Sequence, residues 1–307
     1  MQKVHDLPAI HHYWGGKYLL PKTREFGFSQ PEEFFANHIE RSLVPGRASW
    51  IFSVGAGNCD AEARIAGILQ ARGKREFIIE CLDINPAMLE RGRELAARHG
   101  VLSRMAFTHG DFNSWQPARE YQAVIANQAL HHVLALEHLF DAIKAAIGSQ
   151  GQLIISDMIG RNGHQRWPEA LAIVQEFWRE LPPQYRYHRL HGRQEERFRN
   201  WDHSGSGFEG VRAQDILPLL LQRFHFEVFL PFGNVIDPFI DRAFGGNFDP
   251  AREWDRAFID RVHERDEAEI RSGRIKPTHM FAVVSSREPA AAQLWNGLRP
   301  EACIRPA

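Results

Sequence analysis

The middle of the chain alternates short apolar runs with stretches that mix polar and apolar residues, and glycine or proline marks many of the changes. The apolar runs have the length of buried strands, and the mixed stretches have the length of helices. This alternation predicts a parallel sheet with helices on both faces. The expected strands are 50–54, 76–83, 105–109, 121–127 and 151–157, and the expected helices are 60–72, 85–100 and 137–147.

The alternation breaks after Asp157 and resumes with a helix at 213–223 and strands at 225–230 and 278–285. Helical stretches at 168–181 and 250–272 interrupt it. We therefore predict one α/β sheet domain with a mainly helical cap. The expected parts are a helical lid over 1–48, the core over 49–159, a cap insertion over 160–212, more core over 213–231, a second cap insertion over 232–275, the last core strand within 276–286, and a weakly ordered tail over 287–307.

Composition narrows the class of protein. Of the 307 residues 44% are hydrophobic and 24% charged, and the net charge is -1, which is ordinary for a globular chain. No apolar run approaches the roughly 18 residues of a membrane helix, and the N-terminus shows no apolar signal-peptide core. We therefore expect a cytoplasmic protein without a membrane partner. The oligomeric state stays open.

Cysteine and histidine do not form a recognisable ligand pattern. Cys59, Cys81 and Cys303 are dispersed along the chain, and the histidines are scattered. The cysteine pattern predicts neither a disulfide framework nor a zinc site, and we expect no metal.

Ligands of an open parallel sheet bind beyond the carboxyl ends of its strands. Gly55 and Gly57 follow the first strand and allow close approach of a ligand, although G-x-G alone also fits a plain turn. Asp83 ends the second strand, where its carboxylate can accept from two ribose hydroxyls or cap the next helix. Asp111 and Phe112 follow the third strand and suit an adenine, or a loop beside the core.

Polar side chains also follow the fourth strand, at Asn127, Gln128, His131 and His132. They can line a reacting centre, although a histidine pair at the start of a helix is often structural.

Together these strand ends resemble the class I S-adenosylmethionine-dependent methyltransferase family. The resemblance covers 50–158 closely and 213–285 by the order of strands and helices. The family implies a Rossmann-like doubly wound sheet of seven strands in the order 3-2-1-4-5-7-6, with the last strand antiparallel and S-adenosylmethionine (SAM) as cofactor. The matching segments are SVGAGNCD at 53–60, ECLDINPAML at 80–89, HGDF at 109–112, ANQALHHV at 126–133 and GSQGQLIISD at 148–157.

The resemblance also implies roles for individual residues. Gly55 and Gly57 would approach the methionine part of the cofactor, Asp83 would hold the ribose, and Asp111 the adenine. Asn127 would lie near the sulfonium. The full set of expected cofactor contacts is Gly55, Ala56, Gly57, Asn58, Asp83, Ile84, Asp111, Phe112, Asn127 and Gln128.

The chain departs from the family at two positions of the glycine-rich loop. Ser53 stands where the family often has an acid, and Cys59 stands where it often has a third small residue, glycine. Asn58 or the aromatic N-terminal segment can compensate in holding the methionine part.

Residues outside the loops are candidates for acceptor chemistry. Tyr13 and Trp14 lie in an aromatic segment that suits a sulfonium or anchors the N-terminal arm. Arg161 follows the fifth strand and can grip a substrate carboxylate or form a surface ion pair. We expect Asn127, His131 and Tyr13 to be catalytic, and Tyr13, Trp14, His132 and Arg161 to contact substrate. The wider set of candidate bases is His131, His132, Asp157, His164, Asp202 and His203.

Three functions remain open. We favour a SAM-dependent methyltransferase for a small molecule of specialised metabolism. The first alternative is a SAM-dependent cyclase or lyase, in which the SAM amine attacks its own γ-carbon to give azetidine-2-carboxylate and methylthioadenosine. The second is a non-catalytic SAM-binding protein. We do not expect a nucleic-acid substrate, because Glu195 and Glu196 follow the basic stretch 186–193 and the fourth-strand loop lacks an Asn-Pro-Pro-aromatic signature.

Overall fold

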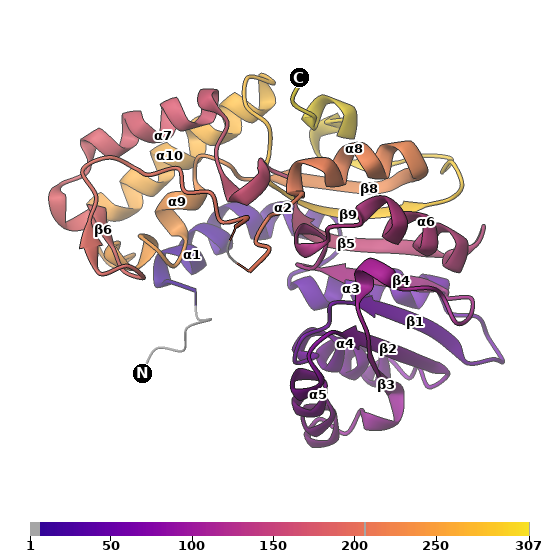
Figure 1. The fold of residues 1–307 in the computed structure, drawn as a ribbon. Helices are drawn as coiled ribbons and strands as arrows, with labels where there is room; N and C mark the ends of the chain where they lie inside the picture. The colour runs from indigo at the N-terminus through magenta and orange to yellow at the C-terminus, as the bar shows by residue number, and fades with distance from the viewer. Residues whose placement is uncertain (1–6, 206, 307) are drawn as a thin grey trace.

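The computed structural model describes residues 7–205 and 207–306, and a mixed eight-stranded sheet lies at the centre of this part of the chain (Figure 1). The strand order is β10-β8-β9-β5-β4-β1-β2-β3. Strands from β3 to β5 pair in parallel, whereas β9 runs antiparallel to β5 and β8. The predicted order is thus confirmed, with β9 and β8 as its last two members. The strands are β1 (Ser49–Val54), β2 (Phe77–Asp83), β3 (Met105–His109), β4 (Ala123–Asn127), β5 (Gln152–Met158), β8 (His225–Phe232), β9 (His279–Ser285) and β10 (Gln293–Leu294).

The sheet has one strand more than the seven predicted. β10 lies in the tail 287–307 and pairs in parallel with the edge strand β8. The next residue, Trp295, packs with its ring centroid 6.3 Å from that of Phe26. A strand of two residues has no detectable alternation, so the composition of the tail wrongly suggested weak order.

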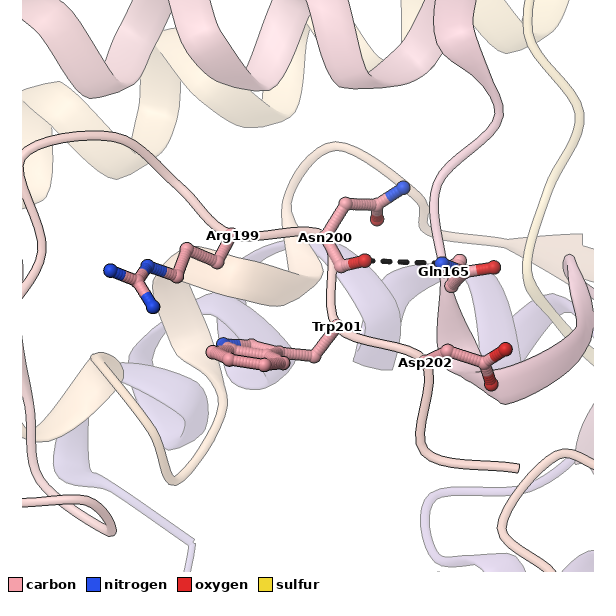
Figure 2. Close-up of a pocket in the computed structure, with 5 residues that line it drawn as sticks. All are labelled: Gln165, Arg199, Asn200, Trp201 and Asp202. Carbon is pink, nitrogen blue, oxygen red and sulfur yellow. Dashed lines mark hydrogen bonds between the residues drawn. The ribbon is translucent and has the colours of Figure 1, made fainter. Parts of the chain in front are cut away.

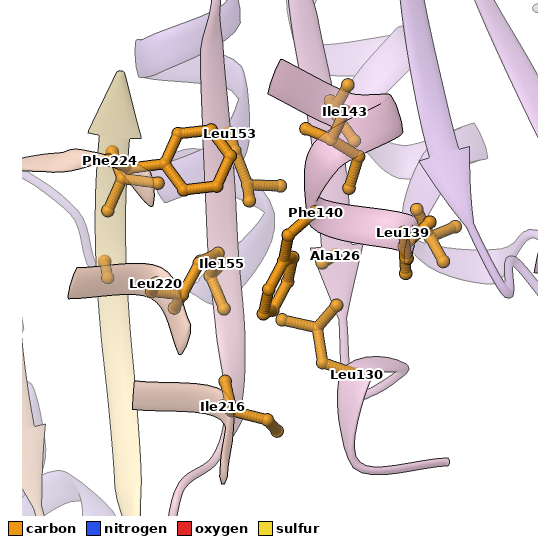
Figure 3. Close-up of a cluster of buried hydrophobic side chains, with 14 of the residues drawn as sticks. Ala126, Leu130, Leu139, Phe140, Ile143, Leu153, Ile155, Ile216, Leu220 and Phe224 are labelled. Carbon is orange, nitrogen blue, oxygen red and sulfur yellow. The ribbon is translucent and has the colours of Figure 1, made fainter. Parts of the chain in front are cut away.

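Helices cover both faces of the sheet. One face carries α6 (Leu136–Ile147) and α8 (Ala213–Arg223), and the other carries α3 (Pro31–Ser42), α4 (Asp60–Ala71) and α5 (Pro86–Arg98). Figure 3 shows the side chains of α6 and α8 meeting those of β4 and β5. Phe140, Leu153 and Ile155 have no exposed surface there. Burial of each such side chain stabilises the folded state by about 1.5–3 kcal/mol. This packing fixes the strands from which the loops of the site extend.

A third apolar cluster joins four helices. These helices lie beside the sheet (Figure 1), and we call them the helical lobe. It contains α1 (Ala9–Trp14), α7 (Pro168–Glu180), α9 (Asp237–Ile240) and α10 (Glu253–Arg271). Between α1 and α3 the chain forms a π-helix (Gly15–Leu19) and α2 (Leu20–Glu25). The segment 1–48, expected to form one lid, is therefore divided, with α1 in the lobe and α3 on the sheet. A two-stranded sheet of β6 (Tyr187–His188) and β7 (Arg193–Gln194) follows α7.

No helix in the described part of the chain has both the length and the apolar character needed to cross a membrane.

His263 of α10 is buried inside the lobe as a neutral side chain. Its Nδ1 accepts a hydrogen bond of 3.2 Å from Trp14 Nε1, and its ring lies 3.8 Å from that of Tyr18. Burial is the main reason why the pKa of His263 is lowered to about 4. Protonation would place a charge in this apolar cluster and remove the acceptor for Trp14.

His263 should make the fold sensitive to acid. Because its pKa is lower in the folded than in the unfolded chain, its contribution is complete above about pH 6.5 and is lost as the pH falls towards 4. His263→Gln keeps an acceptor for Trp14 but cannot titrate. Lowering the pH from 7 to 5 should reduce the unfolding free energy of the wild type. We expect this reduction to be about 2 kcal/mol smaller in His263→Gln.

Urea denaturation at the two pH values measures this difference. His225→Gln, which changes an exposed histidine at the start of β8, serves as control. An equal pH dependence in wild type and His263→Gln would contradict the role of His263.

Candidate functional site

The glycine-rich loop after β1 is held by Asp83 at the end of β2. Gly55 (φ 60°) and Gly57 (φ 56°) adopt left-handed conformations, which glycine takes without strain. The N–H of Gly57 donates to Asp83 Oδ2 at 2.8 Å, and the N–H of Asn85 donates to Oδ1 at 2.8 Å. A carboxylate has about four acceptor positions, so each oxygen of Asp83 keeps one for a ligand.

The loop also leaves room for a ligand. A Cβ atom placed on Gly57 would meet no atom within 4 Å, whereas one on Gly55 would lie 3.2 Å from the Ala129 Cβ. Gly55 therefore lets the β1 and β4 loops approach each other, and Gly57 borders open space. Asn58, the next residue, accepts from Arg91 Nε through its Oδ1 at 2.9 Å.

An acid from α4 stands beside Ser53. The hydroxyl of Ser53 donates to Glu62 Oε1 at 2.7 Å. Glu62 is buried, and burial raises its pKa. The helix that follows the strand thus places a buried carboxyl beside Ser53. Sequence reasoning missed Glu62, although an acid on the apolar face of a predicted helix, beside Ala63, Ile65 and Ala66, was a usable signal.

Cys59 is accommodated by a glycine on the neighbouring helix. It has a left-handed backbone (φ 56°) at the start of α4, a conformation that glycine adopts more readily than other residues. A Cβ atom on Gly92 of α5 would lie 2.8 Å from Cys59 Sγ. The absence of a side chain at Gly92 therefore makes space for the one at Cys59.

The β3 loop places an acid and an aromatic side chain near the glycine-rich loop, and the β2 loop adds an exposed apolar side chain. Asp111 precedes a 3₁₀ turn (Phe112–Ser114) and accepts from Asn113 N at 2.8 Å. Phe112 packs on the apolar cluster of the sheet. Ile84, next to Asp83, is 59% exposed and so offers an apolar surface for a flat ring.

The loop after β4 is held by Asp157 of β5. Asp157 is 1% exposed, and its Oδ2 accepts from the backbone N–H groups of Ala129 at 2.9 Å and Leu130 at 2.7 Å. Its Oδ1 lies 2.6 Å from His131 Nδ1. Asn127 ends β4, and Gln128 has a left-handed backbone (φ 52°). One buried carboxylate thus fixes both the loop and the orientation of the His131 ring.

His131 is one member of a cluster that sequence analysis did not foresee. Its Nε2 lies 3.7 Å from Glu209 Oε2, and His164 Nε2 lies 3.2 Å from the same oxygen. Burial opposes protonation of His131, but the hydrogen bond to Asp157 and the charges of Asp157 and Glu209 outweigh burial and raise its pKa. The fold thus brings together two histidines that are scattered in the sequence. Glu209 lies in a glycine-rich segment without periodicity, so no sequence signal marked it.

His132 and Arg161 lie beside this cluster. The His132 ring centroid is 4.1 Å from that of His131, and its Nδ1 lies 3.3 Å from the Phe208 carbonyl oxygen. Burial, followed by the nearby His131, lowers the pKa of His132. Arg161 Nη1 donates to the Arg166 carbonyl oxygen at 3.2 Å, directly before the 3₁₀ turn (Asn162–His164) that carries His164.

The two N-terminal aromatic candidates contact α10 of the helical lobe. Tyr13 donates through its hydroxyl to Asp260 Oδ1 at 2.9 Å. Trp14 is 4% exposed, and its indole N–H donates to His263. Since that N–H is the only polar group of an indole, Trp14 has none left for a substrate and serves as an anchor for α1.

A pocket of about 300 Å³ opens next to the segment that carries His164 (Figure 2). Gln165, the residue after His164, donates through Nε2 to the Asn200 carbonyl oxygen at 3.1 Å. On the other side, the N–H of His203 donates to the Gly163 carbonyl oxygen at 3.1 Å. The lining residues are Gln165, Arg199, Asn200, Trp201 and Asp202.

Comparison with known proteins defines the fold class. Residues 51–151, about a third of the chain, match the family model described as a methyltransferase domain. No curated protein matches the sequence. The sheet order with antiparallel β9 is that of a Rossmann-like methyltransferase fold.

Solved structures with a similar arrangement are distant. An O-methyltransferase of a polyketide synthase from Brevibacillus brevis, solved with S-adenosyl-L-homocysteine, is 12% identical; the match covers 94% of this chain and 83% of that one, with a TM-score of 0.47. A SAM-dependent methyltransferase from Geobacter sulfurreducens, also with S-adenosyl-L-homocysteine, is 12% identical over 84% and 92% of the two chains, with a TM-score of 0.45. These likenesses say nothing about the acceptor.

Residues 51–151 therefore match a methyltransferase domain.

Asp157 should stabilise the site through the hydrogen bonds that it accepts. In Asp157→Asn an NH₂ group replaces one carboxylate oxygen. Its hydrogens then face N–H groups that the carboxylate oxygen had accepted from. Hydrogen bonds to a charged group contribute about 1.5–3 kcal/mol each, so we expect the unfolding free energy to fall by at least about 2 kcal/mol.

Urea denaturation measures this loss. Asp60→Asn, at the exposed start of α4, is the matched control and should change stability by less than about 0.5 kcal/mol. Equal stability of Asp157→Asn and the wild type would contradict the structural role of Asp157.

Proposed function

We propose that the protein transfers the methyl group of SAM to a small-molecule acceptor. The observation that supports this proposal is the open space at Gly57 beside the Asp83 carboxylate, within the part of the chain that matches a methyltransferase domain. A pocket of about 300 Å³ next to the segment that carries His164 supplies a place for the acceptor. Pockets of roughly 300–1,000 Å³ take small molecules. The acceptor would bind in this pocket, where the lining residue Gln165 directly follows His164. That the acceptor belongs to specialised metabolism stays a prediction of the sequence.

The rim formed by the β1, β2 and β3 loops would hold the cofactor. Asp83 would accept from the ribose hydroxyls with its two remaining lone pairs, and the open space at Gly57 would admit the methionine part. Ile84 and Phe112 would flank the adenine, with Asp111 at its edge. The other residues that we propose to contact the cofactor are Gly55, Ala56, Asn58, Asn127 and Gln128. When bound, SAM supplies an electrophilic methyl group.

His131 would receive the proton of the acceptor. Its Nδ1 faces Asp157, so the proton of the neutral ring lies on Nδ1 and the lone pair of Nε2 faces away from Asp157. A base in this position is effective when it is fixed and close to the acceptor proton. His132 and Arg161 would contact the acceptor beside it. Tyr13, bonded to Asp260, stays a predicted catalytic residue for which the geometry offers no further support.

Removing the carboxylate of Asp83 should weaken cofactor binding. One charge-assisted hydrogen bond contributes about 1.5–3 kcal/mol, and 1.4 kcal/mol corresponds to a factor of ten in affinity. We expect Asp83→Ala to raise the Kd for S-adenosylhomocysteine at least ten-fold in isothermal titration calorimetry.

Asp60→Ala, at the exposed start of α4, is the control and should leave the Kd unchanged. Asp83→Asn, which keeps one acceptor oxygen, should show an intermediate loss. An unchanged Kd in Asp83→Ala would refute the ribose contact.

The by-product formed from SAM tests the reaction itself. We expect S-adenosylhomocysteine to accumulate with an accepted small molecule and to be absent without one, as measured by mass spectrometry. Release of methylthioadenosine from protein and SAM alone would overturn methyl transfer in favour of cyclisation. Binding of SAM without any product across an acceptor panel would point to a non-catalytic protein.

A further inference from the structure

Three side chains from separate loops direct ligand atoms at one point. His131 follows β4, His164 follows β5, and Glu209 precedes α8. Their ligand atoms all lie within 4.8 Å of one another. Glu209 Oε2 is central, at 3.2 Å from His164 Nε2 and 3.7 Å from His131 Nε2.

Backbone hydrogen bonds hold the three loops together. The N–H of Val211 donates to the His131 carbonyl oxygen at 3.0 Å, and the N–H of Gly163 donates to the Gly210 carbonyl oxygen at 2.9 Å. The segment around Glu209 is therefore tied to both histidine loops. A Cβ atom on Gly210 would lie 3.0 Å from the His164 ring, so glycine at this position lets the ring approach the backbone.

The orientation of His131 is that of a metal ligand. Its Nδ1 faces Asp157 at 2.6 Å, which keeps the proton on that nitrogen and leaves the Nε2 lone pair directed at Glu209. A histidine that binds a metal through one ring nitrogen commonly donates the other N–H to a carboxylate in this way. When the His131 ring is neutral, Nε2 and the Glu209 oxygen are two acceptors that face each other, so this place favours a proton or a metal cation between them.

The spacing fits a small divalent ion. A metal with bonds of about 2.0–2.1 Å keeps neighbouring ligand atoms roughly 3.0–3.4 Å apart. The separation between His164 Nε2 and Glu209 Oε2 already has this length at 3.2 Å, and that between His131 Nε2 and Glu209 Oε2 is about 0.3 Å beyond it at 3.7 Å. Two imidazole nitrogens and one carboxylate oxygen suit first-row divalent transition metals and leave coordination positions free.

We propose that His131, His164 and Glu209 bind a divalent transition-metal ion of the zinc type. Only the role of the metal ion rests on the proposed function. The ion would bind the acceptor group that becomes methylated and would favour loss of the proton from that group. His131 would then orient the ion instead of acting as a free base. The binding itself is independent of SAM.

Metal titration of the full-length protein tests the proposal. We expect the metal-free wild type to bind one Zn²⁺ per chain in calorimetry, and Co²⁺ to give visible absorption bands of a low-symmetry nitrogen and oxygen site. His164→Ala and Glu209→Gln should each weaken Zn²⁺ binding at least about ten-fold. Glu209→Gln serves as a second variant because it preserves the shape of the side chain.

His203→Ala is the matched control. The centroid of the His203 ring lies 6.4 Å from that of His164, but His203 is not one of the three proposed ligands. The His203→Ala variant should therefore bind Zn²⁺ with the affinity of the wild type. Absence of Zn²⁺ binding by the wild type, or equal binding by His164→Ala, would overturn the proposal. So would an equal loss in His203→Ala, which would show histidine binding outside the cluster.

Measuring the cofactor affinity of the same variants distinguishes failure of the metal proposal from failure of the proposed function. Binding of S-adenosylhomocysteine should stay at the wild-type level in Glu209→Gln while Zn²⁺ binding falls. A protein that binds Zn²⁺ but forms no S-adenosylhomocysteine would refute methyl transfer and leave the metal site standing. A protein that methylates an acceptor without binding Zn²⁺ would do the reverse.

Discussion

The site depends on how the backbone N–H groups beyond the strand ends are hydrogen-bonded. A buried N–H without an acceptor is costly, and these loops have no neighbouring strand to provide one. Asp83 accepts from Gly57 in the β1 loop and from Asn85 after its own strand. Asp157 of β5 does the same for two residues of the β4 loop. Each carboxylate therefore joins the loops of two adjacent strands, Asp83 those of β1 and β2 and Asp157 those of β4 and β5.

A second set of contacts joins this rim to the helical lobe. Arg166, just after the His164 turn, donates to Asp237 Oδ2 at 2.8 Å and to the Asn234 carbonyl oxygen at 2.9 Å. Asp237 is the first residue of α9. The cofactor would therefore be held by loops of the sheet, and the acceptor by residues that the insertions bring to them. This division lets the inserted segments vary the acceptor pocket without disturbing the loops at Gly57 and Asp83.

The sequence predicted the parts of the molecule that local pattern determines. Apolar runs predicted β1 and β5, and the residues following the strands predicted Asp83 and His131 as site candidates. It could not predict contacts made by chain segments far apart. Glu209 is 78 residues from His131, and only the folding of the insertion brings them together. Glu62 could have been noticed as a charge on an apolar helix face, but its partner Ser53 could not. β10 is too short to show any period.

His131 connects the two halves of the proposed site. Its Nδ1 faces the carboxylate that orders the β4 loop, and its Nε2 faces a carboxylate supplied by the insertion. The carboxylates of Asp157 and Glu209, on opposite sides of the buried ring, favour a positive charge at that ring. Methyl transfer to an O–H, N–H or S–H acceptor releases one proton, so a place that favours positive charge beside the acceptor serves the reaction whether a proton or a metal ion occupies it. The same electrostatic requirement thus underlies both the proposed proton transfer and the proposed metal site.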